Sequence, residues 1–223
     1  MTDTARFRSV VYTFVSSLFS DPSSERFRLL FDESFRRAVT ESCEALGGVD
    51  EKKGESLSVL ARSLFDRLSR TERSIENEYV ATFGHTLSKP TSPYELEHLR
   101  NEDVFYRTQR LADLEGFYRA FGLALDRKER ADHISVETEF LAHLLAKEVF
   151  ARDNHLGDDA IEVCRKAHRD FWTDHFGGWT PVFLENVAAL SAGDFYPKAS
   201  RFTSRFLHME RDQHHEGYGS AEK

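Results

Sequence analysis

Apolar residues recur three and four positions apart through most of the chain, and no stretch alternates apolar and polar residues for long. This spacing lines one face of an α-helix and argues against β-strands. The segments that carry it are Thr4–Phe19, Ser23–Leu46, Ser56–Leu68, Thr71–Phe83, Glu95–Leu123, the part of Glu129–Glu148 after Asp132, Asp158–Phe176, Thr180–Ser191 and Phe195–Met209. The pattern predicts an all-α protein, built as a single globular domain of about eight or nine helices.

Gly, Pro and short polar residues separate these segments. Gly47-Gly48 is a helix stop signal, and Thr180-Pro181 is a start signal with Thr180 as the N-cap. The break Gly84–Pro93 has no periodicity, so we expect an extended loop of the kind that often carries function. Together with the charged connection Asp126–Ala131, it is a candidate hinge. We expect one domain over residues 1–211 and a polar, disordered tail over residues 212–223.

The helix that follows Asp132 combines a charged start with apolar residues on one side. Asp132 stands where an N-cap belongs, because a short carboxylate accepts the free backbone N–H groups of the first turn. His133 and Glu137 are four residues apart and fall inside the apolar sector, whereas Glu139 and His143 project to the opposite side. We therefore expect the first pair to face protein and the second pair to face water.

The chain is acidic, with 38 Asp and Glu against 30 Lys and Arg and a net charge of −8. Binding to nucleic acid needs an excess of Lys and Arg, so no nucleic-acid partner is expected, whereas a basic partner is compatible. The two cysteines, Cys43 and Cys164, give neither a disulfide framework nor a zinc spacing. The first segment is typical of an amphipathic helix rather than a signal peptide, and no apolar run is long enough for stable membrane insertion. We expect a cytoplasmic protein.

Known catalytic motifs are absent from the sequence, which contains no GxxxxGK[ST], GxGxxG or HExxH. One Glu-x-x-His pair, Glu95 and His98, has the spacing of a di-iron ligand motif, but such sites need a second copy and further carboxylates. Cys164 lies mid-helix, where it is expected to be a small buried hydrophobe. We therefore expect that the protein is not an enzyme and that it has neither a metal site nor a bound cofactor. A metal-dependent helical enzyme is the least favoured alternative.

Four segments follow one another in a recognisable order. They are Glu78–Gly84 (EYVATFG), Ser92–Glu95 (SPYE), Glu129–Ile134 (ERADHI) followed by Val136–Leu141, and HRDFWTDHFGGWTPVFLENV followed by Asp194–Tyr196. Together they resemble motifs of the TorD/DmsD/NarJ family of redox-enzyme maturation chaperones, over nearly the whole chain. Two residues depart from the family's pattern: Thr82 stands where the family usually has Leu, and Arg130 where it usually has Pro. The second departure removes a rigid residue from the connection before the helix.

The resemblance implies a cytoplasmic, all-helical chaperone rather than an enzyme. Such a protein binds the twin-arginine signal peptide or N-terminal tail of a molybdopterin oxidoreductase catalytic subunit of the dimethyl sulfoxide reductase type. It assists cofactor insertion, folding and assembly before export. A signal peptide carries a basic region followed by an apolar stretch, which suits an apolar groove with carboxylates at its rim. The resemblance leaves open a monomer or a domain-swapped dimer, with residues 126–131 as the hinge.

The predicted peptide-binding residues are Tyr79, Phe83, Tyr94, Glu95, Asp132, His133 and Glu137. The resemblance implies that Asp132 and His133 lie beside the peptide groove. We expect them to line one cleft with Tyr94 and Glu95, where the two loops meet. The two aromatic residues before the first loop are expected core residues that form the groove floor.

A purely structural interpretation stands beside this one. Asp132 is then only an N-cap, and His133 with Glu137 is a buried pair that holds the helix against the core. The alternative function for the chain is a helical adaptor or regulator without specificity for signal peptides.

Overall fold

The structure is a computed structural model that describes residues 4–47, 55–69, 72–84, 90–99, 103–125 and 129–218, with the side chains of 72, 73 and 212–218 excepted. In chain order its helices are α1 (Thr4–Phe19), α2 (Glu25–Arg28), α3 (Glu33–Leu46), α4 (Leu57–Leu68), α5 (Glu72–Phe83), α6 (Val104–Ala120), α7 (Ile134–Asp153), α8 (Asp158–Phe171), α9 (Thr180–Leu190) and α10 (Phe195–Tyr218). Short 3-10 turns stand at Leu29–Phe31 and Glu95–Glu97, and a π-turn at Trp172–Phe176. No strand occurs within these ranges, and the predicted all-α class is confirmed.

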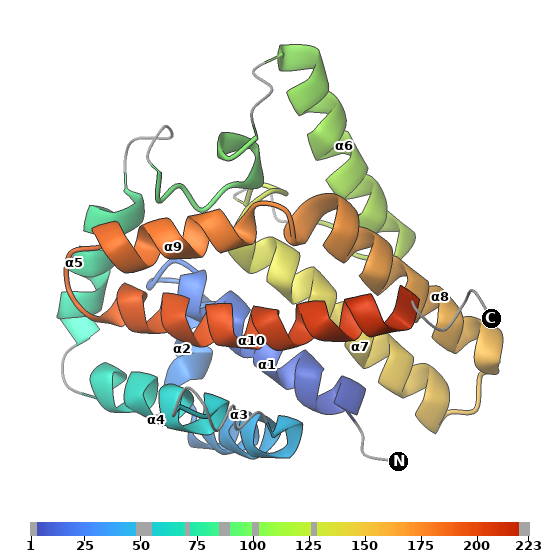
Figure 1. Ribbon diagram of the computed structural model, residues 1–223, viewed down its shortest axis with the longest axis horizontal. Coiled ribbons are helices and arrows are strands. Elements are labelled where there is room, and N and C mark those ends of the chain that lie inside the picture. The colour runs from blue at the N-terminus through green and yellow to red at the C-terminus, as the bar shows by residue number, and fades with distance from the viewer. Residues whose placement is uncertain are drawn as a thin grey trace.

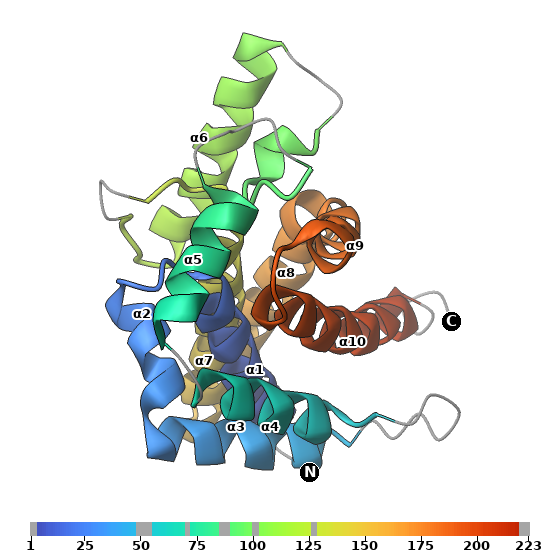
Figure 2. The same ribbon diagram turned by 90° about the vertical axis from the view of Figure 1, so that its left-hand side faces the viewer.

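Helices α1 and α7 form the centre of the fold and pack along each other (Figure 1). On its other side α7 packs against α8, while α3 and α4 cover α1 and α10 from below. Figure 2 shows α9 and α10 as a second layer beside this centre. The interior is filled largely by aromatic rings, and Phe14, Phe19, Phe140, Phe171 and Phe202 are at most 1% exposed. The helical period of the sequence therefore predicted most of the helices that pack here, because most of them bury an apolar face.

The second predicted helix, Ser23–Leu46, is divided in the structure. Asp32 has extended backbone angles (φ −77°, ψ 123°), and its carboxylate accepts a hydrogen bond from the N–H of Phe35. It therefore N-caps α3, after a 3-10 turn that ends α2. Apolar periodicity does not reveal such a break, because the three- and four-residue spacing continues through it, from Phe27 and Phe31 to Phe35 and Val39.

Other helix boundaries also differ from the sequence prediction. The predicted helix Glu95–Leu123 is one 3-10 turn followed by α6, whose N-cap is Asp103. Trp179 rather than Thr180 takes the N-cap position of α9. Helix α10 runs to Tyr218, so the polar segment 212–218 is helical, and residues 219–223 of the predicted disordered tail lie outside the described residues.

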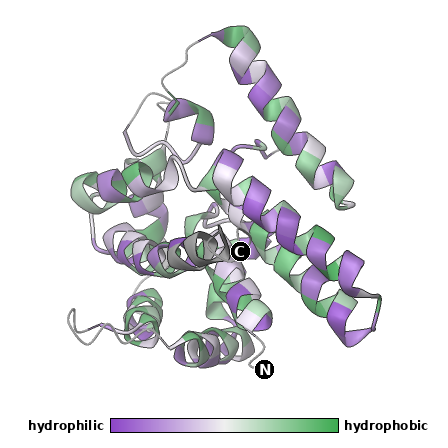
Figure 3. Ribbon diagram, turned by 45° about the vertical axis from the view of Figure 1, so that its right-hand side comes forward, coloured by the Kyte–Doolittle hydropathy of each residue, from purple (hydrophilic) through white to green (hydrophobic). Residues whose placement is uncertain are grey.

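Helix α6 projects away from the rest of the fold (Figures 1 and 2). Only Leu114 and Tyr118 of this helix are buried, and Val104 and Phe105 at its start are 76% and 78% exposed. Figure 3 shows hydrophobic and hydrophilic positions mixed along it, in contrast to the two-sided α8. Because α6 lacks a continuous apolar face, polar contacts must help to hold it against the fold.

None of the described helices combines the length and the apolar character that a membrane span requires.

Candidate functional site

The two segments singled out by the sequence, 92–97 and 129–134, lie side by side. Their backbones form an isolated antiparallel bridge between Tyr94 and His133. The N–H of Glu95 donates to the carbonyl of Asp132 at 2.8 Å, and the N–H of Ile134 donates to the carbonyl of Pro93 at 2.9 Å. The structure therefore brings four of the predicted site residues together. It buries three of them, since Glu95, Asp132 and His133 are 0%, 0% and 9% exposed.

The N-cap of α7 is His133, and not Asp132 as the sequence predicted. His133 has extended backbone angles, and its Nδ1 accepts a hydrogen bond from the N–H of Ser135 at 3.1 Å. The predicted pair of His133 with Glu137 is also not formed. Because His133 stands outside the helix, the four-residue spacing does not bring the two side chains together. Glu137 instead accepts a hydrogen bond from the indole N–H of Trp179 at 3.1 Å.

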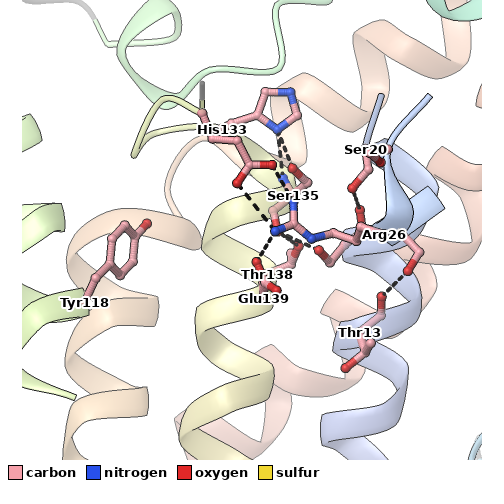
Figure 4. A network of polar contacts seen from close by, with 12 residues as sticks. Thr13, Ser20, Arg26, Tyr118, His133, Ser135, Thr138 and Glu139 are labelled. Carbon is pink, nitrogen blue, oxygen red and sulfur yellow. Dashed lines mark hydrogen bonds and ion pairs between the residues drawn. The ribbon is translucent and has the colours of Figure 1, made fainter. Parts of the chain in front are cut away.

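The start of α7 is also fixed from the N-terminal side (Figure 4). The hydroxyl of Ser16 donates to the carbonyl of Ser135 at 2.7 Å. Arg26 reaches across from α2 and forms ion pairs with Glu129 and with Glu139. The predicted outward pair of Glu139 and His143 is therefore only half right: Glu139 is exposed but bound to Arg26, and His143 is half-buried beside the carbonyl of Phe121.

Burial lowers the pKa of His133 to about 3, and the positive charges of Arg26 and Arg130 act in the same direction. The imidazole is therefore neutral in the folded chain at neutral pH, and its unprotonated Nδ1 can serve as the cap. Protonation would cost the N-cap hydrogen bond and place a charge in a buried position.

We predict that His133 makes the chain less stable in mild acid. Between pH 6.5 and 3 the unfolded chain protonates this histidine and the folded chain does not, so the free energy of unfolding falls as pH falls. His133→Asn keeps an N-cap side chain but cannot titrate. From pH 7 to pH 5, wild type should lose about 2 kcal/mol more than His133→Asn in denaturant titrations. The pKa of buried Glu137 is raised by burial, Glu95 and Asp132, but its opposite contribution is common to both proteins. Equal losses of unfolding free energy in the two proteins would contradict the assignment of His133 as the buried, neutral N-cap.

Asp132 is held by the neighbouring residue that departs from the family's pattern. Arg130 donates two hydrogen bonds to its carboxylate, from Nε to Oδ1 at 2.9 Å and from Nη2 to Oδ2 at 2.7 Å. The same guanidinium lies over the ring of Tyr94, with Cζ 4.1 Å from the ring centroid. Its Nη2 also lies 3.9 Å from Oε1 of Glu97. Arg130, which stands where a rigid proline is usual, thus joins the segment 129–134 to the segment 92–97.

The remaining carboxylates point into the protein. Oε1 of Glu95 accepts hydrogen bonds from the Nε (2.9 Å) and Nη2 of Arg110 on α6, and its Oε2 lies 3.6 Å from Nδ1 of His175. Arg110 also donates to the carbonyl of Asp174 in the π-turn. One carboxylate oxygen of Glu95 and one of Glu137 have no hydrogen-bond partner among the described residues. This cluster ties α6, α7 and the π-turn to the segment 92–97.

Tyr79 and Phe83 lie on α5, half-buried, with their ring centroids 5.3 Å apart. Both rings pack on Tyr196, at 6.1 and 4.7 Å. The pKa of Tyr79 is raised by burial and by the nearby Asp21 and Tyr94. The hydroxyl of Thr91 donates to the carbonyl of Thr82 at 2.7 Å, so the segment that leads to the half-buried Tyr94 lies against the end of α5. We call Tyr79, Phe83 and Tyr94 the aromatic surface. They are the predicted site residues that reach solvent.

The sequence reasoning missed several residues of this region, namely Arg26, Arg110, His175 and Trp179. The last two lie in a segment that the resemblance had marked, but nothing in it indicated contact with Glu95 or Glu137. Within the described part of the chain no three His, Cys, Asp or Glu side chains are placed to hold a metal ion. Glu95 and His98 bind Arg110 and the carbonyl of Ser92, respectively.

Comparison with known proteins gives one family. Residues 46–185 match the model of the nitrate reductase delta subunit. The perchlorate reductase assembly chaperone protein of Dechloromonas aromatica is 29% identical over 65% of this chain, and the selenate reductase assembly chaperone protein of Thauera selenatis is 38% identical over 53%. The chain spans 64% and 60% of the length of these two relatives. The chaperone protein TorD of Vibrio parahaemolyticus is 26% identical over 91% of this chain and 92% of its own length. As its motifs predicted, the chain belongs to the nitrate reductase delta subunit family, which is the TorD/NarJ family.

Proposed function

We propose that this chain is a cytoplasmic assembly chaperone for a molybdopterin oxidoreductase of the dimethyl sulfoxide reductase type. It binds the twin-arginine signal peptide or N-terminal tail of the catalytic subunit and assists cofactor insertion and folding before export. Membership in the family carries the proposal, and relatives named as assembly chaperones of perchlorate and selenate reductases support it. It acts as a monomer or as a domain-swapped dimer.

The geometry supports a peptide site at the aromatic surface. Tyr94 is fixed by the backbone bridge to α7, and Tyr79 and Phe83 present half-buried rings on the neighbouring α5. Rings held in this way can bind apolar side chains of a peptide with little loss of conformational freedom. The buried Glu95 and His133 then position this surface, because His133 pairs with Tyr94, and Glu95 with Asp132, through their backbones.

Substitution of Tyr94 tests this site. We expect Tyr94→Ala to weaken binding of a synthetic twin-arginine signal peptide about tenfold, because an aromatic contact of this kind contributes more than 1 kcal/mol. Isothermal titration calorimetry measures the change. Tyr106→Ala is the matched control, because Tyr106 is 40% exposed on the projecting α6, and it should bind as wild type does.

Melting curves separate binding from folding. If Tyr94→Ala melts as wild type does and binds the peptide equally well, the aromatic surface is not the site. If wild type itself does not distinguish the peptide from one of scrambled sequence, the helical adaptor without signal-peptide specificity becomes the better account.

A further inference from the structure

Arg130 makes the contacts with its own chain that a guanidinium group from outside would make. It meets both oxygens of Asp132 with two parallel hydrogen bonds, at 2.9 and 2.7 Å. Its flat guanidinium also covers the ring of Tyr94 at 4.1 Å. A carboxylate that binds the fork and an aromatic face that binds the plane are the two features that select guanidinium over ammonium.

The side chain of Arg130 lies between Asp132 and solvent. Asp132 is 0% exposed, whereas the side chain of Arg130 is 34% exposed. Among the described residues, the one further hydrogen bond to the carboxylate of Asp132 is long, from the N–H of Leu96 at 3.3 Å. Departure of Arg130 would therefore open a binding site for a positive charge and leave a carboxylate in need of a partner.

The contact can be released without unfolding its surroundings. The backbone of Arg130 is held separately, since its carbonyl accepts a hydrogen bond from the N–H of His133 at 3.2 Å. The side chain borders a cavity of about 520 Å³ between α6 and the segment before α7, with Leu111, Leu123 and Leu125 in its wall. An incoming arginine therefore finds space beside Arg130, next to apolar side chains.

We propose that Asp132 and Tyr94 form a guanidinium-binding site that Arg130 occupies in the free chain, and that an arginine of the bound client peptide displaces it. The displacement step rests on the proposed function, whereas the site itself does not. Arg130 acts as an internal competitor. It lowers the affinity for peptides that place an arginine in this site, because that arginine must first displace Arg130 from Asp132 and Tyr94.

Chemical rescue tests the site without any peptide. Arg130→Ala is expected to melt at a lower temperature than wild type, and millimolar methylguanidinium should raise its melting temperature. Methylammonium should not do so, because it cannot bridge both oxygens of Asp132. Arg130→Gln keeps one donor toward Asp132 and is used if the alanine variant does not fold.

Two controls make the rescue specific. Arg119→Ala removes a 68% exposed arginine that pairs with Glu115, and methylguanidinium should leave it unchanged. The double variant Arg130→Ala/Asp132→Asn should also gain nothing. An equal rise in the double variant, an equal effect of methylammonium, or no rise in Arg130→Ala would overturn the site.

Peptide titrations test the displacement. Arg130→Ala should bind a twin-arginine peptide about tenfold more tightly than wild type, while the same peptide with both arginines replaced by lysine gains nothing. If the twin-arginine peptide binds both proteins with equal affinity, displacement of Arg130 is wrong. If neither protein binds it, the proposed function fails, and the rescue experiment alone decides on the guanidinium site.

Discussion

Arg110→Ala is expected to destabilise the chain by about 3–5 kcal/mol, because it removes the cation that neutralises a fully buried carboxylate. Glu95 is 0% exposed, and Arg110 provides both of its strong hydrogen bonds. Arg110 also joins α6 to the π-turn. Its loss would therefore release α6 and the segment 92–97 together. Denaturant titration followed by circular dichroism measures the change.

Arg107→Ala is the matched control, because Arg107 lies one turn earlier on the same helix. It pairs with Glu97, and both side chains are more exposed, at 28% and 16%. We expect it to cost about 1 kcal/mol. Adding Glu95→Gln to Arg110→Ala should restore part of the lost stability, because the buried charge is then absent. A loss for Arg110→Ala no larger than that for Arg107→Ala would show that the ion pair does not hold this region.

Phe140→Ala is expected to lower the free energy of unfolding by about 3–5 kcal/mol, through the cavity that the missing ring leaves. Phe140 is 1% exposed, and its ring centroid lies 4.7 Å from Phe171 on α8 and 4.9 Å from Tyr118 on α6. Phe150→Ala, on the same helix but 61% exposed, should change stability by about 0.5 kcal/mol or less. Comparable losses in the two variants would place the core elsewhere.

The helices could be predicted from the sequence because each has an apolar face that repeats with the helical period. The boundaries depended on local hydrogen bonds that this period does not report. The carboxylate of Asp32 begins a new helix within a continuous apolar pattern. Similarly, the pattern predicted a helix from Glu95, but the N–H of Glu95 donates to the carbonyl of Asp132 before α7.

The sequence indicated which segments form the candidate site, but not which of their side chains face solvent. The motifs predicted that the segments around Tyr94 and Asp132 meet. Which side chains face solvent depended on residues distant in the chain. Glu95 turns inward because Arg110 and His175 are there to meet it, and Glu137 because Trp179 donates to it. No local pattern records such tertiary contacts, so carboxylates expected at a groove rim are in the interior.

Arg130 is another residue whose contacts the sequence did not predict. As a departure from a proline, it was expected to weaken the geometry of the connection before α7. In the structure its guanidinium joins Asp132 to Tyr94, so a flexible residue is fixed by an ion pair and a ring contact. Residues 126–128, the first half of the predicted hinge, lie outside the described residues.

Co-purification tests the central claim most directly. The chain, carrying an affinity tag, is expressed in its own cells, and the bound proteins are identified by mass spectrometry and assayed for molybdopterin. We predict enrichment of a molybdopterin oxidoreductase catalytic subunit that lacks its cofactor, and loss of that subunit when its N-terminal segment is deleted. Recovery of the subunit with its full cofactor content, or equal recovery after the deletion, would contradict a chaperone that binds the N-terminal segment before cofactor insertion.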